Sequence, residues 1–572
     1  MTKPKKKAKE WLQEPFDQET QRITQELIDA DNEELVEAFH DDLAFGTGGM
    51  RGIMGVGTNR INRYTLGKNT QGVANYLHEQ FPNKEEISVA IAYDCRRNSR
   101  SLADVVAEVL SANNIRVKLF PSLRPTPLLS YAVKYLDCQC GIVLTASHNP
   151  PEYNGYKVYW EDGGQLVPPQ DNEIVKRISS LRFSDIKFKK QTDKIDILDE
   201  KVDQAFIRES VAKASFRLND GNDNRSKLNV VFTSLHGTAI TLNPKVLEQA
   251  GYTNLNIVEE QAEPDGEFPT VVSPNPEEPE ALKMALELAD RKNADIVIGT
   301  DPDADRLGVA VRDLNGKMTI LNGNQAMLLM TWFLLHQHGE MKGNEYIAST
   351  IVSTPMMKKL ADHFKVDYQE TLTGFKWIAD VIKRHPEKDF IGGGEESFGF
   401  MVGDFVRDKD SITSTLLICE LAAYLNSKGS SVYEKLIELY KDIGCYHEKL
   451  VALVKKGRKG AEEIDQKMSD LREDPLKQID GEPVISVADY KKQVSYDIQN
   501  EKKMKLDLPA SNVLIYHTAS GTKVCARPSG TEPKIKFYIS VNAQLEDVAE
   551  YEQLKHQLEK KVQRITSELG IT

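Results

Sequence analysis

The chain has 572 residues, and at roughly 150 residues per domain this length predicts several domains rather than one. Charged residues make up 28% and hydrophobic residues 40% of the chain, which excludes the disordered and fibrous classes. The formal net charge of −13 argues against a nucleic-acid-binding protein, which would present a basic face.

Cysteine spacing and apolar runs narrow the class further. The six cysteines include no C-x-x-C pair, so we expect neither a disulfide framework nor a zinc site, and a reducing cytoplasmic location suits them. The longest apolar run, residues 326–335, is far shorter than the ~20 residues needed to cross a bilayer, so no membrane contact is expected. The N-terminal lysines are not followed by an apolar stretch, which argues against a secretory signal.

Strand and helix patterns alternate through most of the chain. Residues 87–94 and 115–121 are rich in β-forming residues, and between them apolar residues recur at helical spacing from Leu102 to Leu110. This strand–helix–strand order predicts a βαβ unit. The same pattern recurs at residues 227–260, 280–301 and 345–373.

The C-terminal part has a different pattern. Apolar and polar residues alternate over 535–541, which is typical of a half-buried antiparallel strand. A last amphipathic helix ends at Gly570, and its apolar face consists of Leu554, Leu558, Val562, Ile565 and Leu569. We therefore predict an α/β protein whose final domain is α+β.

The first loop of chemical interest is Thr-Ala-Ser-His-Asn-Pro at 145–150, directly after an apolar run. Open α/β sheets bind ligands beyond their strand ends, which is where Ser147 lies, although an ordinary turn is the alternative. Adjacent side chains diverge, so we do not expect Ser147 and His148 to meet as in a Ser-His-Asp hydrolase. The G-x-S-x-G pattern of many such hydrolases is also absent.

The second loop carries Asp301, Asp303 and Asp305, again after an apolar run. Three carboxylates at alternate positions beside Pro302 can converge on a hard cation such as Mg²⁺. An EF-hand is excluded because Arg306 occupies the position of its obligatory glycine. The alternative is an acidic turn whose carboxylates cap the backbone.

Two further loops combine glycine with polar side chains. In GGGEESFGF at 392–400, the glycines allow close approach to a ligand, and Glu395 and Ser397 can bind hydroxyl groups. The paired acids could instead act as a general acid and base, and a Gly-rich turn is the simplest alternative. RPSGTEP at 527–533 offers an arginine fork, two hydroxyls and a glycine, which suit a phosphate. Because a Walker A motif is absent, we predict a non-nucleotide phosphate site.

Together, the four loops resemble those of the α-D-phosphohexomutase superfamily. Its phosphoserine, metal, sugar and phosphate loops match residues 145–150, 301–306, 394–399 and 527–533, in the family's order. FGTGGMRG at 45–52 and AYDCRR at 92–97 are lesser matches. NGYKVYW at 154–160 and TGFKWI at 373–378 look closest to the phosphoglucomutase and phosphopentomutase branch. Phe375 stands where the bacterial phosphomannomutase branch has a histidine, so no catalytic histidine is assigned in the third domain.

The resemblance implies a heart-shaped protein with four domains around a central cleft. Three are mixed α/β domains, which carry the phosphoserine, metal and sugar loops, and the last is an α+β domain with the phosphate loop. The boundaries that we predict are 1–205, 206–322, 323–440 and 441–572.

The resemblance also implies roles for individual residues. Ser147 would carry the phosphoryl group and, together with Asp301, Asp303 and Asp305 of the loop that ends in Arg306, hold one Mg²⁺ per chain. The catalytic candidates are Ser147, Arg51, His148 and Lys157. Lys157 is the first candidate for accepting the hydroxyl proton, with a pKa lowered by burial beside other cations; a plain substrate-contacting cation is the alternative. The candidates for substrate binding are Thr373, Gly374, Glu395, Ser397, Lys409, Arg527, Ser529, Gly530 and Thr531.

The activity implied is the interconversion of glucose 1-phosphate and glucose 6-phosphate through a phosphoserine enzyme and glucose 1,6-bisphosphate, which would also serve as activator. Small sugar phosphates would be the partners of a cytoplasmic monomer or weak dimer. The alternatives are a phosphopentomutase, a sugar-bisphosphate synthase, a phosphatase that forms an aspartyl phosphate on the D-x-D loop, and a non-catalytic paralogue.

Overall fold

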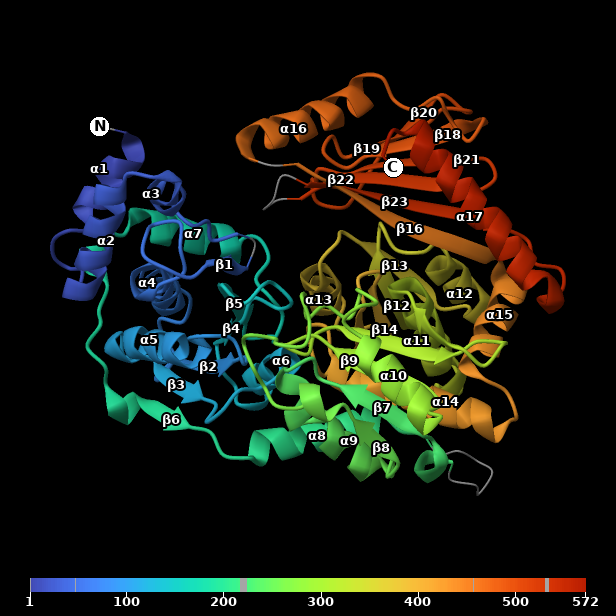
Figure 1. Ribbon diagram of the computed structural model, residues 1–572, viewed down its shortest axis with the longest axis horizontal. Coiled ribbons are helices and arrows are strands. Elements are labelled where there is room, and N and C mark those ends of the chain that lie inside the picture. The colour runs from blue at the N-terminus through green and yellow to red at the C-terminus, as the bar shows by residue number, and fades with distance from the viewer. Residues whose placement is uncertain (1, 47, 217–223, 456, 530–533, 572) are drawn as a thin grey trace. The chain divides into compact units, whose positions relative to one another are not determined.

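A computed structural model of the chain describes residues 2–46, 48–216, 224–455, 457–529 and 534–571. The chain packs as two compact units (Figure 1). The first comprises Met1–Gln337 and Phe375–Gly429, and the second comprises His338–Gly374 and Ser430–Thr572. No helix of the described part of the chain is long and apolar enough to cross a membrane.

The first unit begins with three helices, α1 (Lys3–Glu10), α2 (Gln18–Ala30) and α3 (Glu33–Phe39). A six-stranded sheet follows, in the order β1 (Gly49–Ile53), β5 (Tyr153–Trp160), β4 (Cys140–Leu144), β2 (Ser88–Tyr93), β3 (Arg116–Leu119) and β6 (Ile195–Ile197). Strands β4, β2, β3 and β6 are parallel to one another, β5 is antiparallel to β4, and β1 is antiparallel to β5. The predicted βαβ unit is confirmed as β2, α5 (Ser99–Ala112) and β3.

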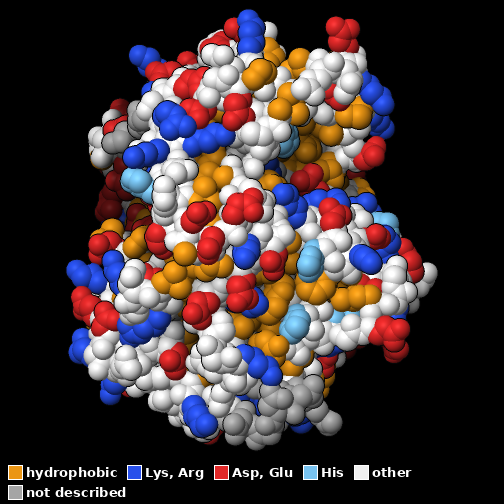
Figure 2. Space-filling view, turned by 90° about the vertical axis from the view of Figure 1, so that its right-hand side faces the viewer, with side chains coloured by type: hydrophobic (Ala, Val, Ile, Leu, Met, Phe, Trp, Pro, Cys, Tyr) orange, Lys and Arg blue, Asp and Glu red, His pale blue; other side chains and the backbone are white. Residues whose placement is uncertain are grey.

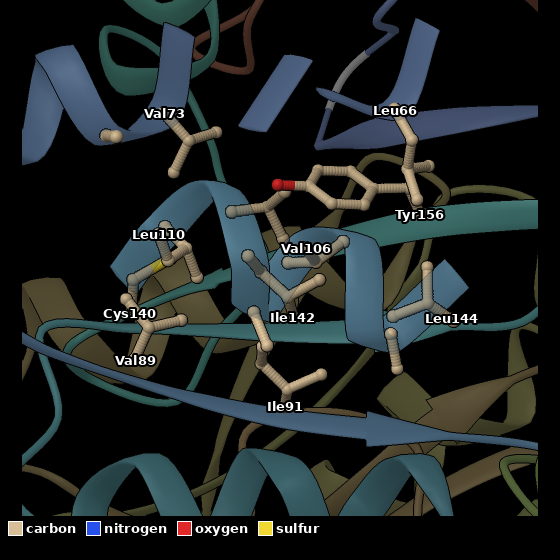
Figure 3. Packing of buried hydrophobic residues seen from close by; sticks show 14 of the residues in the cluster. Leu66, Val73, Val89, Ile91, Val106, Leu110, Cys140, Ile142, Leu144 and Tyr156 are labelled. Atoms are coloured by element: carbon tan, nitrogen blue, oxygen red, sulfur yellow. The ribbon is translucent and has the colours of Figure 1, made fainter. Parts of the chain in front are cut away.

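Apolar side chains from two helices and the central strands form the core beside this sheet. Leu66 and Val73 of α4 (Arg63–Gln80) pack with residues of α5, β2 and β4 and with the buried ring of Tyr156 (Figure 3). Helix α6 (Thr126–Tyr135) packs on β2 and β4. Helices α7 (Gln170–Ser180) and α8 (Lys201–Ala214) follow in the chain.

The second sheet of this unit has five strands, in the order β11 (Met318–Leu321), β10 (Leu307–Arg312), β9 (Ile296–Thr300), β7 (Val230–Thr233) and β8 (Leu255–Ile257). Strands β7, β8 and β9 are parallel to one another, β10 is antiparallel to β9, and β11 is antiparallel to β10. Helices α9 (Asn243–Ala250) and α10 (Lys283–Lys292) connect the parallel strands, as the sequence pattern predicts. Residues 264–280 form a long loop between β8 and α10.

The remainder of the first unit contains α11 (Gly323–Gln337), α13 (Phe375–Arg384), the antiparallel hairpin β14 (Asp389–Glu395) and β15 (Gly399–Val402), and α14 (Ser411–Ser427). The hairpin turn carries the predicted sugar loop. Figure 2 shows acidic and basic side chains interspersed over one face of the molecule.

The second unit contains a parallel strand pair and a large antiparallel sheet. Strand β12 (Glu345–Thr350), α12 (Met356–Phe364) and β13 (Asp367–Thr371) form another βαβ unit. The sheet runs in the order β16 (Cys445–Val454), β23 (Lys534–Ala543), β22 (Lys523–Pro528), β21 (Leu514–Thr518), β18 (Glu482–Asp489), β19 (Val494–Asp497) and β20 (Lys502–Lys505), with β17 (Gln478–Ile479) paired to β18. Its helices are α15 (Val432–Ile443), α16 (Gly457–Glu473) and α17 (Tyr551–Glu568).

The C-terminal pattern read from the sequence is confirmed. Strand β23 lies between β16 and β22 and is antiparallel to both. Helix α17 buries Leu558, Val562 and Ile565, and Gly570 follows it with a φ of 60°, a left-handed conformation that glycine adopts without strain.

Candidate functional site

Ser147 and Asp301 meet because each follows the end of a parallel strand in the first unit. Ser147 comes three residues after β4, and Asp301 directly follows β9. The Ser147 hydroxyl donates a hydrogen bond to Oδ2 of Asp301 over 2.7 Å, and the serine is only 4% exposed. Two segments that are 154 residues apart in sequence thus form one site.

His148 corrects one inference from the sequence. Its Nδ1 lies 3.1 Å from Oγ of Ser147, so the two adjacent side chains do not diverge. The reason is the backbone of Ser147, whose φ of 51° lies in the left-handed region and turns the two side chains towards each other. Burial of the imidazole, with Arg306 and Arg51 nearby, holds the pKa of His148 well below its ordinary value. The ring is therefore neutral at pH 7.

Three buried carboxylates form the metal loop. Asp301, Asp303 and Asp305 are 0%, 1% and 2% exposed, and each offers an oxygen within 4.8 Å of the other two. The backbone N–H groups of Asp305 and Arg306 donate to Oδ1 of Asp301, each over 3.0 Å, and so orient that carboxylate. Oδ1 of Asp303 and Oδ1 of Asp305 are buried without a hydrogen-bond partner among the described residues. Buried oxygens of this kind are what a hard cation requires, so the donor set fits a metal ion.

Two lysines form ion pairs with these carboxylates and offset part of their negative charge. Nζ of Lys157 lies 2.7 Å from Oδ2 of Asp303 and 3.1 Å from Oδ2 of Asp305, and Nζ of Lys409 lies 3.2 Å from Oδ2 of Asp305. Burial, together with the negative charges of Asp303 and Asp305, raises the pKa of Asp301 well above its ordinary value. Burial acts in the same direction on Asp303, but Lys157 outweighs it and lowers the pKa of that carboxyl.

The lowered pKa expected for Lys157 is not found. Burial does disfavour the ammonium, but Asp303 and Asp305 outweigh burial and raise the pKa of Lys157. The sequence could not reveal this because both acids come from a different sheet. Lys157 lies on β5, and Arg51 on the neighbouring strand β1 reaches the serine loop, where its Nη1 donates to Oδ1 of Asn149 over 2.8 Å.

The sugar loop lies close to the metal loop within the first unit. The N–H of Leu307 donates to the carbonyl of Phe398 over 2.9 Å. Glu395 is buried at the end of β14. Burial lowers the pKa of Lys409, but the negative charges of Asp305, Asp408 and Glu395 outweigh burial and raise that pKa. A Cβ on Gly399 would stand 2.4 Å from Cδ of Lys409, so glycine is needed for the lysine to pass.

Three further positions of this unit, Ser397, Phe375 and Arg306, were also singled out from the sequence. Ser397 is half-buried in the turn of the β14–β15 hairpin. Phe375, at the position where the phosphomannomutase branch has histidine, places its ring 5.3 Å from the Lys409 ammonium, a cation–π contact. Arg306 is half-buried and pairs with Glu277 of the 264–280 loop.

The remaining predicted binding residues belong to the second unit. The hydroxyl of Thr373 is buried and has no hydrogen-bond partner within the described ranges, and Gly374 adopts a φ of 116° that favours glycine. Arg527 lies half-buried on β22 beside Lys536 of β23, and the N–H of Ser529 donates to the carbonyl of Lys534 over 2.7 Å. Gly530 and Thr531 lie outside the described residues.

Some functional neighbours had no signal in the sequence. Asp408 is buried and pairs with Lys409 over 3.1 Å, while Tyr159 and Gln165 donate to its other oxygen over 2.7 and 2.8 Å. The Thr126 hydroxyl, at the start of α6, donates to Asp303 over 3.0 Å. Only the short AYDCRR match pointed towards Arg96, which contacts the backbone of the serine loop.

Comparison with known proteins identifies the family. Family models for the α/β/α domains I, II and III of phosphoglucomutase/phosphomannomutase match residues 42–185, 205–316 and 322–440. A phosphoglucomutase of Staphylococcus epidermidis is 38% identical over 519 residues, which cover 90% of this chain and 94% of that protein. A phosphoglucomutase of Staphylococcus aureus is 37% identical over 520 residues, covering 90% and 92%.

Solved structures share the fold. A putative phosphomannomutase from Thermus thermophilus has a TM-score of 0.68 at 21% identity and covers 92% of this chain and 99% of its own. The open form of parafusin, a phosphoglucomutase from Paramecium, has a TM-score of 0.65 at 17% identity and covers 91% and 95%. The predicted fold class, three α/β domains followed by a different C-terminal domain, is confirmed.

The fold and the serine–carboxylate site therefore define a phosphosugar mutase, an isomerase of the phosphotransferase type. The chain belongs to the phosphoglucomutase/phosphomannomutase family, as the four loops predicted.

Proposed function

We propose that the protein is a phosphoglucomutase, which interconverts glucose 1-phosphate and glucose 6-phosphate through a phosphoserine at position 147. The observation that carries the proposal is the 2.7 Å hydrogen bond from the Ser147 hydroxyl to Asp301, inside a cluster of three buried carboxylates. The 38% identity to a phosphoglucomutase over 90% of the chain supports glucose phosphates as substrates.

The reaction consists of two phosphoryl transfers in opposite directions. In the first, the 6-hydroxyl of glucose 1-phosphate attacks phosphoserine 147; the bond from phosphorus to the serine oxygen breaks, a bond to O6 forms, and the hydroxyl gives up its proton. The product, glucose 1,6-bisphosphate, then turns within the site. In the second transfer its 1-phosphoryl group passes to Ser147, which leaves glucose 6-phosphate. Added glucose 1,6-bisphosphate would act as activator because it phosphorylates a dephosphorylated serine.

Positioning and charge neutralisation dominate such transfers. We propose that Ser147, Asp301, Asp303 and Asp305 hold one Mg²⁺ per chain, with Arg306 in the same loop. When bound, the ion neutralises charge that develops on the transferring phosphoryl group. Arg51, which lies against the serine loop, adds positive charge on the same side. His148 is neutral and is placed to hydrogen-bond Ser147.

Lys157 remains our proposed proton acceptor, since a bound cation would neutralise Asp303 and Asp305, whose charges raise its pKa, and would leave burial to favour the neutral amine. Lys157→Arg tests this role, because arginine preserves the positive charge and cannot be deprotonated in proteins. If Lys157 accepts the proton, kcat falls by orders of magnitude with little change in KM; if the lysine is only a cation, the arginine variant retains most of kcat.

The sugar and its second phosphate need separate contacts, because each substrate binds in two orientations. We propose that Glu395, Ser397 and Lys409, with Thr373 and Gly374, bind the sugar and its hydroxyls. Arg527, Ser529, Gly530 and Thr531 would bind the phosphate that is not reacting. An arginine fork with several N–H and hydroxyl donors suits the oxygens of a phosphate.

A phosphopentomutase would differ from this proposal in its substrate, whereas a sugar-bisphosphate synthase would release the bisphosphate and need another phosphoryl donor for Ser147. A panel of hexose, pentose and aminosugar 1-phosphates, assayed with and without glucose 1,6-bisphosphate, tests the assignment. The highest kcat/KM should be for glucose 1-phosphate; a higher value for a pentose phosphate would replace the proposed function. Intact-mass and peptide mapping should place acid-stable phosphate on Ser147, whereas an acid-labile phosphate on an aspartate would indicate the phosphatase alternative.

The setting of the enzyme follows from the same reasoning. We propose a cytoplasmic monomer or weak dimer, and the six cysteines, all present as thiols, support a reducing compartment. Sedimentation of the purified chain at several concentrations tests the oligomeric state.

A further inference from the structure

A single buried arginine, Arg96, donates hydrogen bonds to the backbone of the serine loop. Arg96 lies just beyond β2, and its side chain is 0% exposed. Its Nη2 donates to the carbonyl of Ser147 over 2.5 Å and to the carbonyl of Asn149. Its Nη1 donates to the carbonyls of Pro150 and Tyr153 over 2.8 and 3.1 Å. One guanidinium thus binds four carbonyls of the segment that carries the reactive serine.

The arginine is itself fixed by Asp94. Oδ2 of this buried carboxylate lies 3.4 Å from Nε of Arg96, and its Oδ1 accepts from the N–H of Arg96 and the hydroxyl of Ser99. The hydroxyl oxygen of Thr145 accepts from the N–H of Ser147 over 2.8 Å. The N–H and the carbonyl of Ser147 are therefore both held by buried side chains, those of Thr145 and Arg96.

The 264–280 loop, which belongs to the second sheet, also packs against Arg96. The ring of Phe268, which is 1% exposed, lies 5.1 Å from the guanidinium. A Cβ on Gly266 would stand 2.8 Å from Cα of Arg96 and 2.7 Å from the backbone nitrogen of Arg97, so this loop touches the backbone there. The loop with Asp301, Asp303 and Asp305 belongs to the same sheet as Gly266 and Phe268. Arg96 therefore contacts both the serine loop and the part of the chain that carries these carboxylates.

We propose that Arg96 is a positioning residue, which holds the left-handed backbone of Ser147 so that its hydroxyl faces Asp301. A left-handed φ of 51° is unfavourable for serine, and it persists only where surrounding contacts determine it. Arg96 contacts no reacting atom, since all four of its acceptors on this segment are backbone carbonyls. This inference rests on the proposed function, because it assigns the arginine to phosphoryl transfer at Ser147.

The test compares Arg96→Lys and Arg96→Gln with Arg97→Gln. Arg97 is the matched control, since it lies next to Arg96 in the chain and its exposed side chain forms an ion pair with Glu267. We would measure kcat and KM for glucose 1-phosphate, the rate of Ser147 phosphorylation by glucose 1,6-bisphosphate from intact mass, and the melting temperature.

A displacement of about 1 Å at a reacting group costs on the order of 100-fold in rate. We therefore expect Arg96→Lys to lower kcat and the phosphorylation rate by about 100-fold, with a KM within about 3-fold of the wild type. The loss in kcat and in the phosphorylation rate should be larger for Arg96→Gln. For Arg97→Gln, which removes only an exposed ion pair, both rates should stay within about 2-fold of the wild-type values. A folded Arg96→Lys enzyme with near-wild-type kcat would overturn the proposal, as would an equal loss in Arg97→Gln.

Gly266→Ala gives a second measurement that removes no charge. Its new methyl group displaces the backbone around Arg96, so it should lower kcat and the phosphorylation rate while KM stays near the wild-type value. If the Arg96 variants do not fold, this variant decides: an unchanged kcat in folded Gly266→Ala enzyme overturns the proposal. Failure of the proposed function is recognised separately, because the wild-type enzyme would then lack mutase activity.

Discussion

Asp303→Asn isolates the charge of one proposed metal ligand while preserving the shape of the side chain. At an effective dielectric constant of ~20, two carboxylates whose oxygens lie within 4.8 Å of each other repel by at least about 3.5 kcal/mol, and a Lys–Asp pair at 2.7 Å attracts by about 6 kcal/mol. The substitution relieves two such repulsions and removes one such attraction. Lys409 adds to the attraction of Lys157, and the surroundings as a whole lower the pKa of Asp303 and so favour its charged form; without a cation the substitution should therefore lower the melting temperature by a few degrees.

The response to Mg²⁺ should change far more. Affinity for a hard cation follows the number of charged oxygen ligands, so the Mg²⁺ concentration for half-maximal activity should rise by at least about 10-fold in Asp303→Asn. The assay is mutase activity against Mg²⁺ concentration after exhaustive chelation, together with melting curves of the phospho and dephospho forms. Phosphoserine adds close to two negative charges, so Mg²⁺ should stabilise the wild-type phospho form more than the dephospho form.

Asp290→Asn is the control, because Asp290 is exposed on α10 and pairs with Arg312 at the surface. This variant should require the same Mg²⁺ concentration as the wild type. An unchanged Mg²⁺ requirement in Asp303→Asn, or full wild-type activity after chelation, would show that the three aspartates form only an acidic turn.

The other predictions concern the nucleophile, the distal phosphate and a buried carboxyl. Ser147→Ala should abolish turnover without unfolding the protein, since a loop hydroxyl contributes little packing; near-full activity in the assay would refute the phosphoenzyme. Arg527→Gln should raise KM for glucose 1-phosphate more than it lowers kcat, provided the contact is equally strong in ground and transition states, and an unchanged KM would count against this role. Burial raises the pKa of Glu448 from 4.5 to about 7, so its stabilising contribution is complete below pH 4.5 and is lost as the pH rises through 7, by about 3 kcal/mol in total. Urea unfolding at pH 5 and pH 8 should show a smaller decrease for Glu448→Gln than for the wild type, and equal decreases would contradict this pKa.

The candidate residues of the site could be proposed from the sequence because their signals are local. An apolar run followed by a polar loop shows that the loop stands at a strand end, and parallel strands present such loops on one edge of a sheet. Ser147 and Asp301 were found in this way, and the structure places them 2.7 Å apart. The alternation in 535–541 and the apolar face of 554–569 depend only on side-chain periodicity, so β23 and α17 were predicted correctly as well.

Tertiary structure decided what depends on distances between remote segments and on backbone angles. The sequence does not show that φ of Ser147 is 51°. This angle brings Nδ1 of His148 close to the serine hydroxyl. The pKa of Lys157 is raised rather than lowered because Asp303 and Asp305, some 150 residues away in the chain, outweigh the effect of burial. Likewise, in the sequence Arg96 is only one basic residue of a short motif. The folded chain brings four backbone carbonyls of residues 147–153 to its guanidinium. Local patterns determine which residue types stand at strand ends, whereas electrostatic and hydrogen-bond partners are set by the packing of whole sheets against each other.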